Sequence, residues 1–158
     1  MPKETAAWLR MALLAALSAA AIAAPAGAAG PTAHLTPAAA VEGHCAAWNT
    51  PDREARDRLL RRVFARDGVY SDPTPTYARG RVGLSNAIAQ FQREYPGARF
   101  RCSAPQTHHN AMRVSWVLRR PDGSVVTEGT DFYELVPDGL IRRITGFFGP
   151  APALDPPR

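Results

Sequence analysis

Two aspartates are the residues whose sequence surroundings best suit chemistry, and Asp72 is the first. It follows the short alternating run Val69-Tyr70-Ser71 and precedes Pro73. Proline favours extended geometry in the residue before it and cannot donate a hydrogen bond to a sheet, so Asp72 is expected where a strand ends. A loop position of this kind can hold a side chain over a pocket. Asp-Pro is also a turn signal, so a purely local role stays open.

Asp131 lies inside the alternating segment GTDFYEL. Alternation places Asp131 on the same strand face as Gly129, Tyr133 and Leu135. An unpaired carboxylate buried on such a face is costly, and burial raises its pKa. The alternative is that this face is partly solvated. The sequence therefore predicts two carboxyl groups in unlike surroundings, one at a strand end and one among apolar neighbours.

Two histidines are further candidates. His44 recurs with Val41 and Trp48 at helical spacing, where it can donate a hydrogen bond or be merely a packed polar residue. His108 shares the alternation of Met112 and is expected to point inward. The aromatic residues Trp48, Trp116 and Tyr133 are expected to wall a cavity or fill a core.

The sequence favours neither a cofactor nor a metal site. His108 and His109 have no further ligand at a metal-binding spacing. No phosphate-cradling glycine loop, nucleophile elbow or nucleotide fingerprint is present in the 158 residues. We therefore predict a site built from protein side chains alone.

The elements that must position these residues follow a simple order. Thr36-Pro37 and Thr50-Pro51-Asp52 are helix-start signals, and the second helix has an apolar stripe that extends to Phe64. A third helix carries apolar residues between Leu84 and Tyr95 at steps of three and four. A first strand ending at Asp72 separates the last two helices. Four strands follow, in the segments 98–103, 108–120, 124–135 and 140–149, with PDG turns before the last two.

This order predicts an α+β fold in which three N-terminal helices pack on a strongly curved, mostly antiparallel sheet. Such an arrangement encloses a cavity suited to a small ligand. The expected domain spans 36–149, after a flexible lead-in at 29–35 and before a proline-rich tail at 150–158.

The first 28 residues are typical of a secretory signal peptide. A charged start is followed by a short apolar run and by the small-residue site Ala26-Gly27-Ala28. We expect cleavage near Ala28 and export to a periplasm or to the medium, with no stable membrane insertion of the mature protein. An uncleaved anchor is the alternative, although the apolar run is short for a bilayer.

The charge pattern of the chain bears on whether it binds nucleic acid. The net charge is +5, but the acids and arginines of DREARDRLLRR stand four apart, which favours a solvated helix face over nucleic-acid binding.

Cys45 and Cys102 are compatible with one disulfide in an exported protein or with two buried thiols.

The segments AAWNTPD, VYSDP, ARGRVGL and GTDFYELVPDGLIRRITGFFG together resemble the SnoaL-like, nuclear transport factor 2-like superfamily, which includes the ketosteroid isomerases. The resemblance covers roughly residues 40–149. It implies the cone-shaped α+β fold and a pocket for a small hydrophobic molecule. It also implies a homodimer paired through the open sheet face, where Val117, Phe132 and Phe147 are the candidates.

Matched motif by motif, the resemblance places the isomerases' catalytic base at Asp72, their oxyanion-stabilising acid at Asp131 and an aromatic pocket wall at Phe148. In those enzymes, one ionised aspartate moves the proton and one protonated aspartate donates a hydrogen bond. His44 falls where they carry a tyrosine, which argues against steroid isomerisation itself. The resemblance thus implies cofactor-free isomerase, cyclase or hydratase chemistry, or a non-catalytic ligand-binding or dimerisation module.

Overall fold

Three helices and seven strands form the part of the chain that the computed structural model describes, residues 34–153. The expected signal peptide, most of the lead-in and the end of the tail lie outside these residues. The helices are α1 (Pro37–Trp48), α2 (Arg53–Val63) and α3 (Gly80–Glu94). The strands are β1 (Phe64–Ser71), β2 (Tyr77–Arg79), β3 (Arg99–Cys102), β4 (Gln106–His108), β5 (Ala111–Arg119), β6 (Val125–Leu135) and β7 (Ile141–Phe148).

The helix starts follow from their capping residues. Thr36 caps α1 by accepting a hydrogen bond from the backbone N–H of Ala39, and Pro37 occupies the first turn, as the sequence indicates. Asp52 itself caps α2, with its Oδ1 2.8 Å from the N of Ala55, so this helix begins later than a Thr50 cap would place it. The helix also ends earlier than expected, because Phe64 is extended and begins β1.

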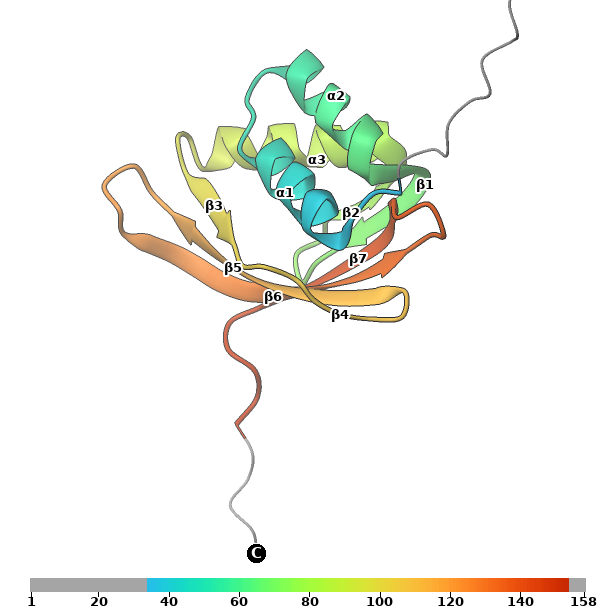
Figure 1. The fold of residues 1–158 in the computed structure, drawn as a ribbon. Coiled ribbons are helices and arrows are strands. Elements are labelled where there is room, and N and C mark those ends of the chain that lie inside the picture. Colours follow the sequence, from blue (N-terminus) through green and yellow to red (C-terminus); the bar gives the residue numbers. More distant parts are fainter. Residues whose placement is uncertain (1–33, 154–158) are drawn as a thin grey trace, which may run out of the picture. The chain divides into compact units, whose positions relative to one another are not determined.

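The sheet has the strand order β2-β1-β7-β6-β5-β3, and β4 pairs with β5 beside this path. β1 and β7 are parallel, whereas the other pairs are antiparallel. All three helices cover one face of this curved sheet (Figure 1). The predicted α+β cone is therefore confirmed. β2, a strand of three residues, is not among the strands that the sequence predicts.

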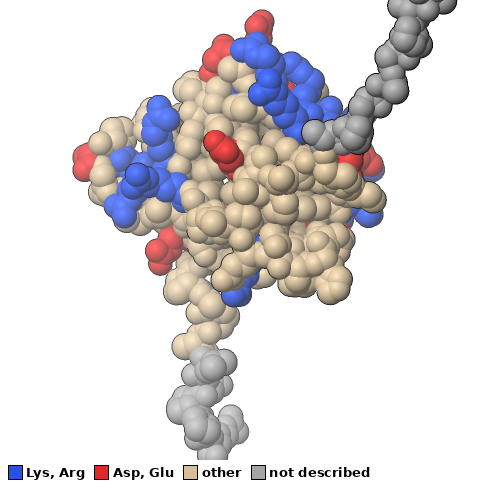
Figure 2. Space-filling view, in the orientation of Figure 1, with Lys and Arg blue, Asp and Glu red and all other residues tan. Residues whose placement is uncertain are grey.

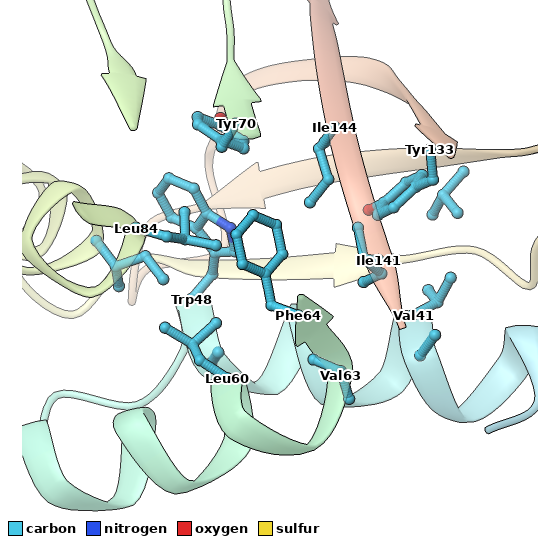
Figure 3. Close-up of a cluster of buried hydrophobic side chains, with 14 of the residues drawn as sticks. Val41, Trp48, Leu60, Val63, Phe64, Tyr70, Leu84, Tyr133, Ile141 and Ile144 are labelled. Carbon is cyan, nitrogen blue, oxygen red and sulfur yellow. The ribbon is translucent and has the colours of Figure 1, made fainter. Parts of the chain in front are cut away.

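The core fills the space between the helices and the inner sheet face (Figure 3). Trp48 of α1, Leu84 of α3 and Phe64 of β1 meet there, and Ile141 and Ile144 project from β7. β5 contributes every second residue to this layer, as its burial pattern shows. The helices are thus packed against the sheet through one core cluster.

The segment around His108 departs from the expected single strand. His108 pairs with Ala111 across a tight reversal, and His109 has a positive φ of 50°. The alternation therefore does not continue from His108 to Met112. Thr107, which pairs with Met112, shares its face of the sheet, and His108 is exposed. The prediction that His108 points inward was wrong.

The charged face of α2 is solvated only in part. Arg53–Asp57 and Glu54–Arg58 form the expected pairs at 3.8 and 3.7 Å. Arg56 instead is 3% exposed and donates to Ser85 of α3 and to backbone oxygens before α2. Arginines gather over α2 and near the turn between β5 and β6 (Figure 2).

Candidate functional site

A cavity of about 160 Å³ lies between α1, α3 and the inner face of the sheet. Eight of its lining residues are Phe, Tyr or Trp, and imidazole, carboxyl, amide and hydroxyl side chains supply its polar part. The lining residues are His44, Cys45, Trp48, Tyr70, Asp72, Thr74, Thr76, Ala87, Gln90, Phe91, Glu94, Tyr95, Phe100, Cys102, Trp116, Leu118, Val126, Thr127, Asp131, Tyr133 and Phe148. An apolar pocket with a few convergent polar groups is the usual form of a small-molecule site.

Asp72 and Asp131 reach the cavity from two strands that β7 separates. Asp72 follows β1, whereas Asp131 lies within β6 opposite Gly146. A Cβ atom on Gly146 would lie 3.0 Å from Oδ1 of Asp131 and 3.4 Å from Cβ of Asp72. Because glycine has no side chain, the two carboxyl groups share one space.

Asp131 is buried, with 7% of its surface exposed. Trp116 Nε1 donates to its Oδ1 at 2.7 Å, and the Tyr133 hydroxyl lies 3.4 Å from its Oδ2. Burial raises the pKa of Asp131 to about 6, and the nearby charge of Asp72 also raises it, whereas the two hydrogen bonds lower it. Asp131 can therefore hold or release a proton near neutral pH.

His44 influences Asp131 through the hydroxyl group of Tyr133. The indole N–H of Trp48 can only donate, so Nε2 of His44 must accept at 2.9 Å. The proton of a neutral His44 then sits on Nδ1, which donates to the Tyr133 hydroxyl oxygen at 3.1 Å. Burial lowers the pKa of His44 to about 3 and keeps it neutral. The imidazole thus directs the Tyr133 hydrogen toward Asp131.

Asp72 is half-buried and held in place by its own neighbours. Tyr70 donates its hydroxyl to Oδ2 at 2.9 Å, and both the backbone N–H and the hydroxyl of Thr74 donate to Oδ1. Burial raises the pKa of Tyr70, so its hydroxyl remains a donor. These bonds fix the orientation of a carboxylate at the cavity wall.

Seven of the eight residues that the sequence singled out lie around this cavity. They are His44, Trp48, Asp72, Trp116, Asp131, Tyr133 and Phe148. His108 is the exception, because it lines a separate pocket formed by β4, β5 and Phe132.

Sequence reasoning missed other residues of the site. Tyr70 stands two residues before Asp72, near the end of β1, so alternation could have placed both side chains on one face. Phe91 and Phe100 were recognised only as apolar positions. Nothing in their local pattern shows that their rings meet at a centroid distance of 5.2 Å beside Trp48.

A disulfide joins Cys45 of α1 to Cys102 of β3, and both cysteines line the cavity. This selects the bonded alternative over two buried thiols. Because the bond connects the helix that carries His44 and Trp48 to the sheet, it holds two walls of the cavity together.

Two wider features concern residues 34–153. No group of three or more His, Cys, Asp or Glu side chains in this range could hold a metal ion. No helix in the range has both the length and the apolar character needed to cross a membrane.

Comparison with known proteins agrees with this architecture. The SnoaL-like domain family matches residues 41–144. A proposed isomerase of the SnoaL-like family from Agrobacterium tumefaciens is 35% identical, with a TM-score of 0.67, and the match covers 76% of this chain and all of that one. The chain belongs to the SnoaL-like family, within the nuclear transport factor 2-like superfamily that the sequence reading identified.

Two other solved structures are similar over most of this chain. A proposed ketosteroid isomerase from Kribbella flavida is 25% identical with a TM-score of 0.53, over 77% of this chain and 84% of that one. A proposed polyketide cyclase from Sinorhizobium meliloti is 18% identical with a TM-score of 0.53, over 68% and 92%, and shows the fold alone. No curated protein matches the sequence.

Proposed function

We propose that this domain binds a small, mostly hydrophobic molecule in the cavity and moves a proton at a carbon next to a carbonyl group. The shared space of Asp72 and Asp131 across Gly146 carries this proposal. Acid–base catalysis of this kind needs one ionised and one protonated group within reach of the same ligand. The reaction class is isomerisation, cyclisation or hydration, without a cofactor.

Asp72 is the proposed base. Its carboxylate takes a proton from the carbon next to the carbonyl, while Tyr70 and Thr74 hold its orientation. The electron pair of the broken C–H bond moves toward the carbonyl oxygen, which becomes enolate-like. For an isomerisation, Asp72 returns the same proton to a different carbon, so the enzyme ends in its starting state.

Asp131 is the proposed acid. In its protonated form it donates a hydrogen bond to the developing oxyanion, the role that a protonated aspartate plays in ketosteroid isomerase. A pKa of about 6 places the protonated form within reach near neutral pH. Trp116 and Tyr133 hold the carboxyl group, and His44 is a positioning residue that acts through Tyr133.

The test is exchange of substrate hydrogen for deuterium, followed by NMR in D₂O with small enolisable ketones and enones. Wild type should accelerate exchange, and Asp72→Asn should lose at least a hundredfold of that acceleration while it keeps its fold. Asp67→Asn is the matched control, because Asp67 is an exposed aspartate of β1 that does not line the cavity. Equal exchange by wild type and Asp72→Asn contradicts the proposal.

A non-catalytic ligand-binding module is the second candidate. The bonds from Thr74 to Asp72 form a local turn, which is the purely structural role that the sequence left open. This function predicts that ligands bind without exchange, and that Asp72→Asn lowers stability rather than turnover.

Export of the mature domain is part of the proposal. The Cys45–Cys102 bond supports it, because disulfides persist in oxidising compartments. Mass spectrometry of the protein recovered from the producing cells and their medium tests it. A mature form that begins near residue 29 supports export, and an intracellular full-length chain contradicts it.

We further propose a homodimer through the sheet face that the helices leave open. Phe132 and Phe147 are 47% and 55% exposed there and pack edge to face at 5.9 Å, with Val117 nearby in the sheet. Glu134 and Arg143 pair at 3.9 Å beside them, so the face carries both signs of charge, which suits a two-fold contact with itself. Sedimentation equilibrium should give a dimer that Phe132→Arg dissociates; a monomeric wild type contradicts this.

A further inference from the structure

We propose that the cavity prefers neutral carbonyl compounds of a single ring over fused-ring and anionic ligands. This inference rests on the proposed function, because the carbonyl group is what Asp72 and Asp131 would act on. It narrows the substrate class by size and by charge, and each limit has its own structural cause.

The size limit comes from the cavity volume of about 160 Å³. An apolar cavity of roughly 150 Å³ in another protein holds benzene. The site can therefore enclose one six-membered ring with its carbonyl group. A second fused ring would extend out of this volume toward the exposed residues Thr74, Glu94 and Tyr95, where it would gain less buried contact.

The apolar end of the cavity is closed by interlocked aromatic rings. Phe100 lies 5.4 Å from Trp48, 5.2 Å from Phe91 and 5.3 Å from Trp116, measured between ring centroids. Each ring is held by the others, so none can withdraw alone to admit a longer ligand. The end wall is a packed cluster contributed by α1, α3, β3 and β5.

Two further features hold the walls at this spacing. The Cys45–Cys102 bond prevents α1 from moving away from β3. Gly129 lets the indole of Trp116 lie across β6, since a Cβ atom on Gly129 would come within 2.5 Å of that ring. The indole is then fixed by its bond to Asp131. The width of the cavity is therefore set by a covalent bond and a hydrogen bond rather than by loose packing.

The charge limit comes from the lining. It contains the acids Asp72, Glu94 and Asp131, and none of the described residues around the cavity is lysine or arginine. The arginines gather elsewhere, over α2 and near the turn between β5 and β6 (Figure 2). A carboxylate or phosphate ligand would be desolvated beside like charges with no cation to pair with it.

The test measures binding of four matched probes by NMR shifts of the protein. They are 2-cyclohexenone, a fused bicyclic enone, a four-ring steroid enone and cyclohexene carboxylate. The affinity for 2-cyclohexenone should exceed the affinity for each of the other three by at least tenfold. Equal or tighter binding of a fused-ring enone overturns the size limit, and equal binding of the carboxylate overturns the charge limit. No shift with 2-cyclohexenone overturns the inference altogether.

A pair of variants checks that the cavity itself causes the selection. Phe148 lines the cavity, is 41% exposed and meets Trp116 edge to face at 5.4 Å. Phe148→Ala should therefore improve binding of the bicyclic enone relative to 2-cyclohexenone by at least threefold. Phe147→Ala removes the neighbouring ring from the opposite sheet face and should leave this ratio unchanged. Equal ratios in both variants contradict the inference.

Two different measurements test this inference and the proposed function, so one can fail without the other. The ranking of the three neutral enones by size depends on shape and should survive in Asp72→Asn, whether or not any ligand reacts. Deuterium exchange depends on the aspartates. If ligands rank by size but no deuterium exchange occurs, the inference is supported and the proposed chemistry is contradicted. If exchange occurs but the steroid binds most tightly, the proposed chemistry is supported and the inference is contradicted.

Discussion

Asp72 and Asp131 meet at Gly146, where a Cβ atom would lie 3.4 Å from Cβ of Asp72 and 3.0 Å from Oδ1 of Asp131. The two carboxyl groups differ in surroundings, because Asp131 is buried beside Trp116 and Tyr133 whereas Asp72 is half-buried at the end of β1. Like charges in one space resist simultaneous ionisation. The two aspartates can therefore take different roles, with Asp131 as the acid and Asp72 as the base.

Gly146→Ala tests the shared space directly. The added methyl group would crowd Oδ1 of Asp131 at 3.0 Å and Cβ of Asp72 at 3.4 Å, so exchange of substrate hydrogen should fall at least tenfold. The measurement is deuterium exchange together with circular dichroism to confirm the fold. Gly83→Ala on α3 is the control, because a Cβ there meets only ordinary contacts at 3.7 to 3.8 Å. Full activity of Gly146→Ala contradicts the account.

Asp131→Asn should change how stability depends on pH. The pKa of Asp131 is raised from 3.8 to about 6 in the folded protein, so its contribution to stability is full below pH 3.8 and is lost as pH rises through 6. The free energy of unfolding of wild type, relative to that of Asp131→Asn, should therefore fall by about 2 kcal/mol between pH 4 and pH 8. Urea denaturation at both pH values measures this, and parallel curves contradict it.

His44→Gln should show the opposite trend. The pKa of His44 is lowered from 6.5 to about 3, so its stability contribution is present above pH 6.5 and is lost as pH falls toward 3. Relative to His44→Gln, wild type should lose about 3 kcal/mol between pH 7 and pH 4. In wild type the trends of His44 and Asp131 oppose each other, so the variants are needed to reveal them. If the difference in unfolding free energy between wild type and His44→Gln does not change with pH, then His44 keeps its ordinary pKa in the folded protein.

Removal of the disulfide should weaken both the fold and the site. Cys45 and Cys102 close a loop of 57 residues, for which the chain-entropy estimate is about 4 kcal/mol. Cys45→Ala/Cys102→Ala should therefore lower the free energy of unfolding by about that amount in urea. Reductant should destabilise wild type and leave the double variant unchanged. An unaffected wild type would mean that the bond does not restrain the chain.

Much of this structure could be predicted from the sequence, because the patterns that determine it are local. Helix caps and strand alternation predicted an α+β fold with helices packed on a curved sheet, and alternation placed Asp131 on the same strand face as Tyr133. The error at His108 arose because a tight reversal interrupts the alternation, and no glycine or proline marks it. The choice between a disulfide and two thiols depends on contacts between residues far apart in the chain, which local patterns do not contain.

The most direct test of the coupled aspartates is the NMR titration of the Asp131 carboxyl group in three proteins. Wild type should titrate near 6. Trp116→Phe removes a hydrogen bond that stabilises the ionised form and should raise the pKa of Asp131, whereas Asp72→Asn removes a like charge and should lower it. Opposite shifts in the two variants support a shared acid–base cavity. A wild-type pKa near 3.8 that neither variant moves would contradict it.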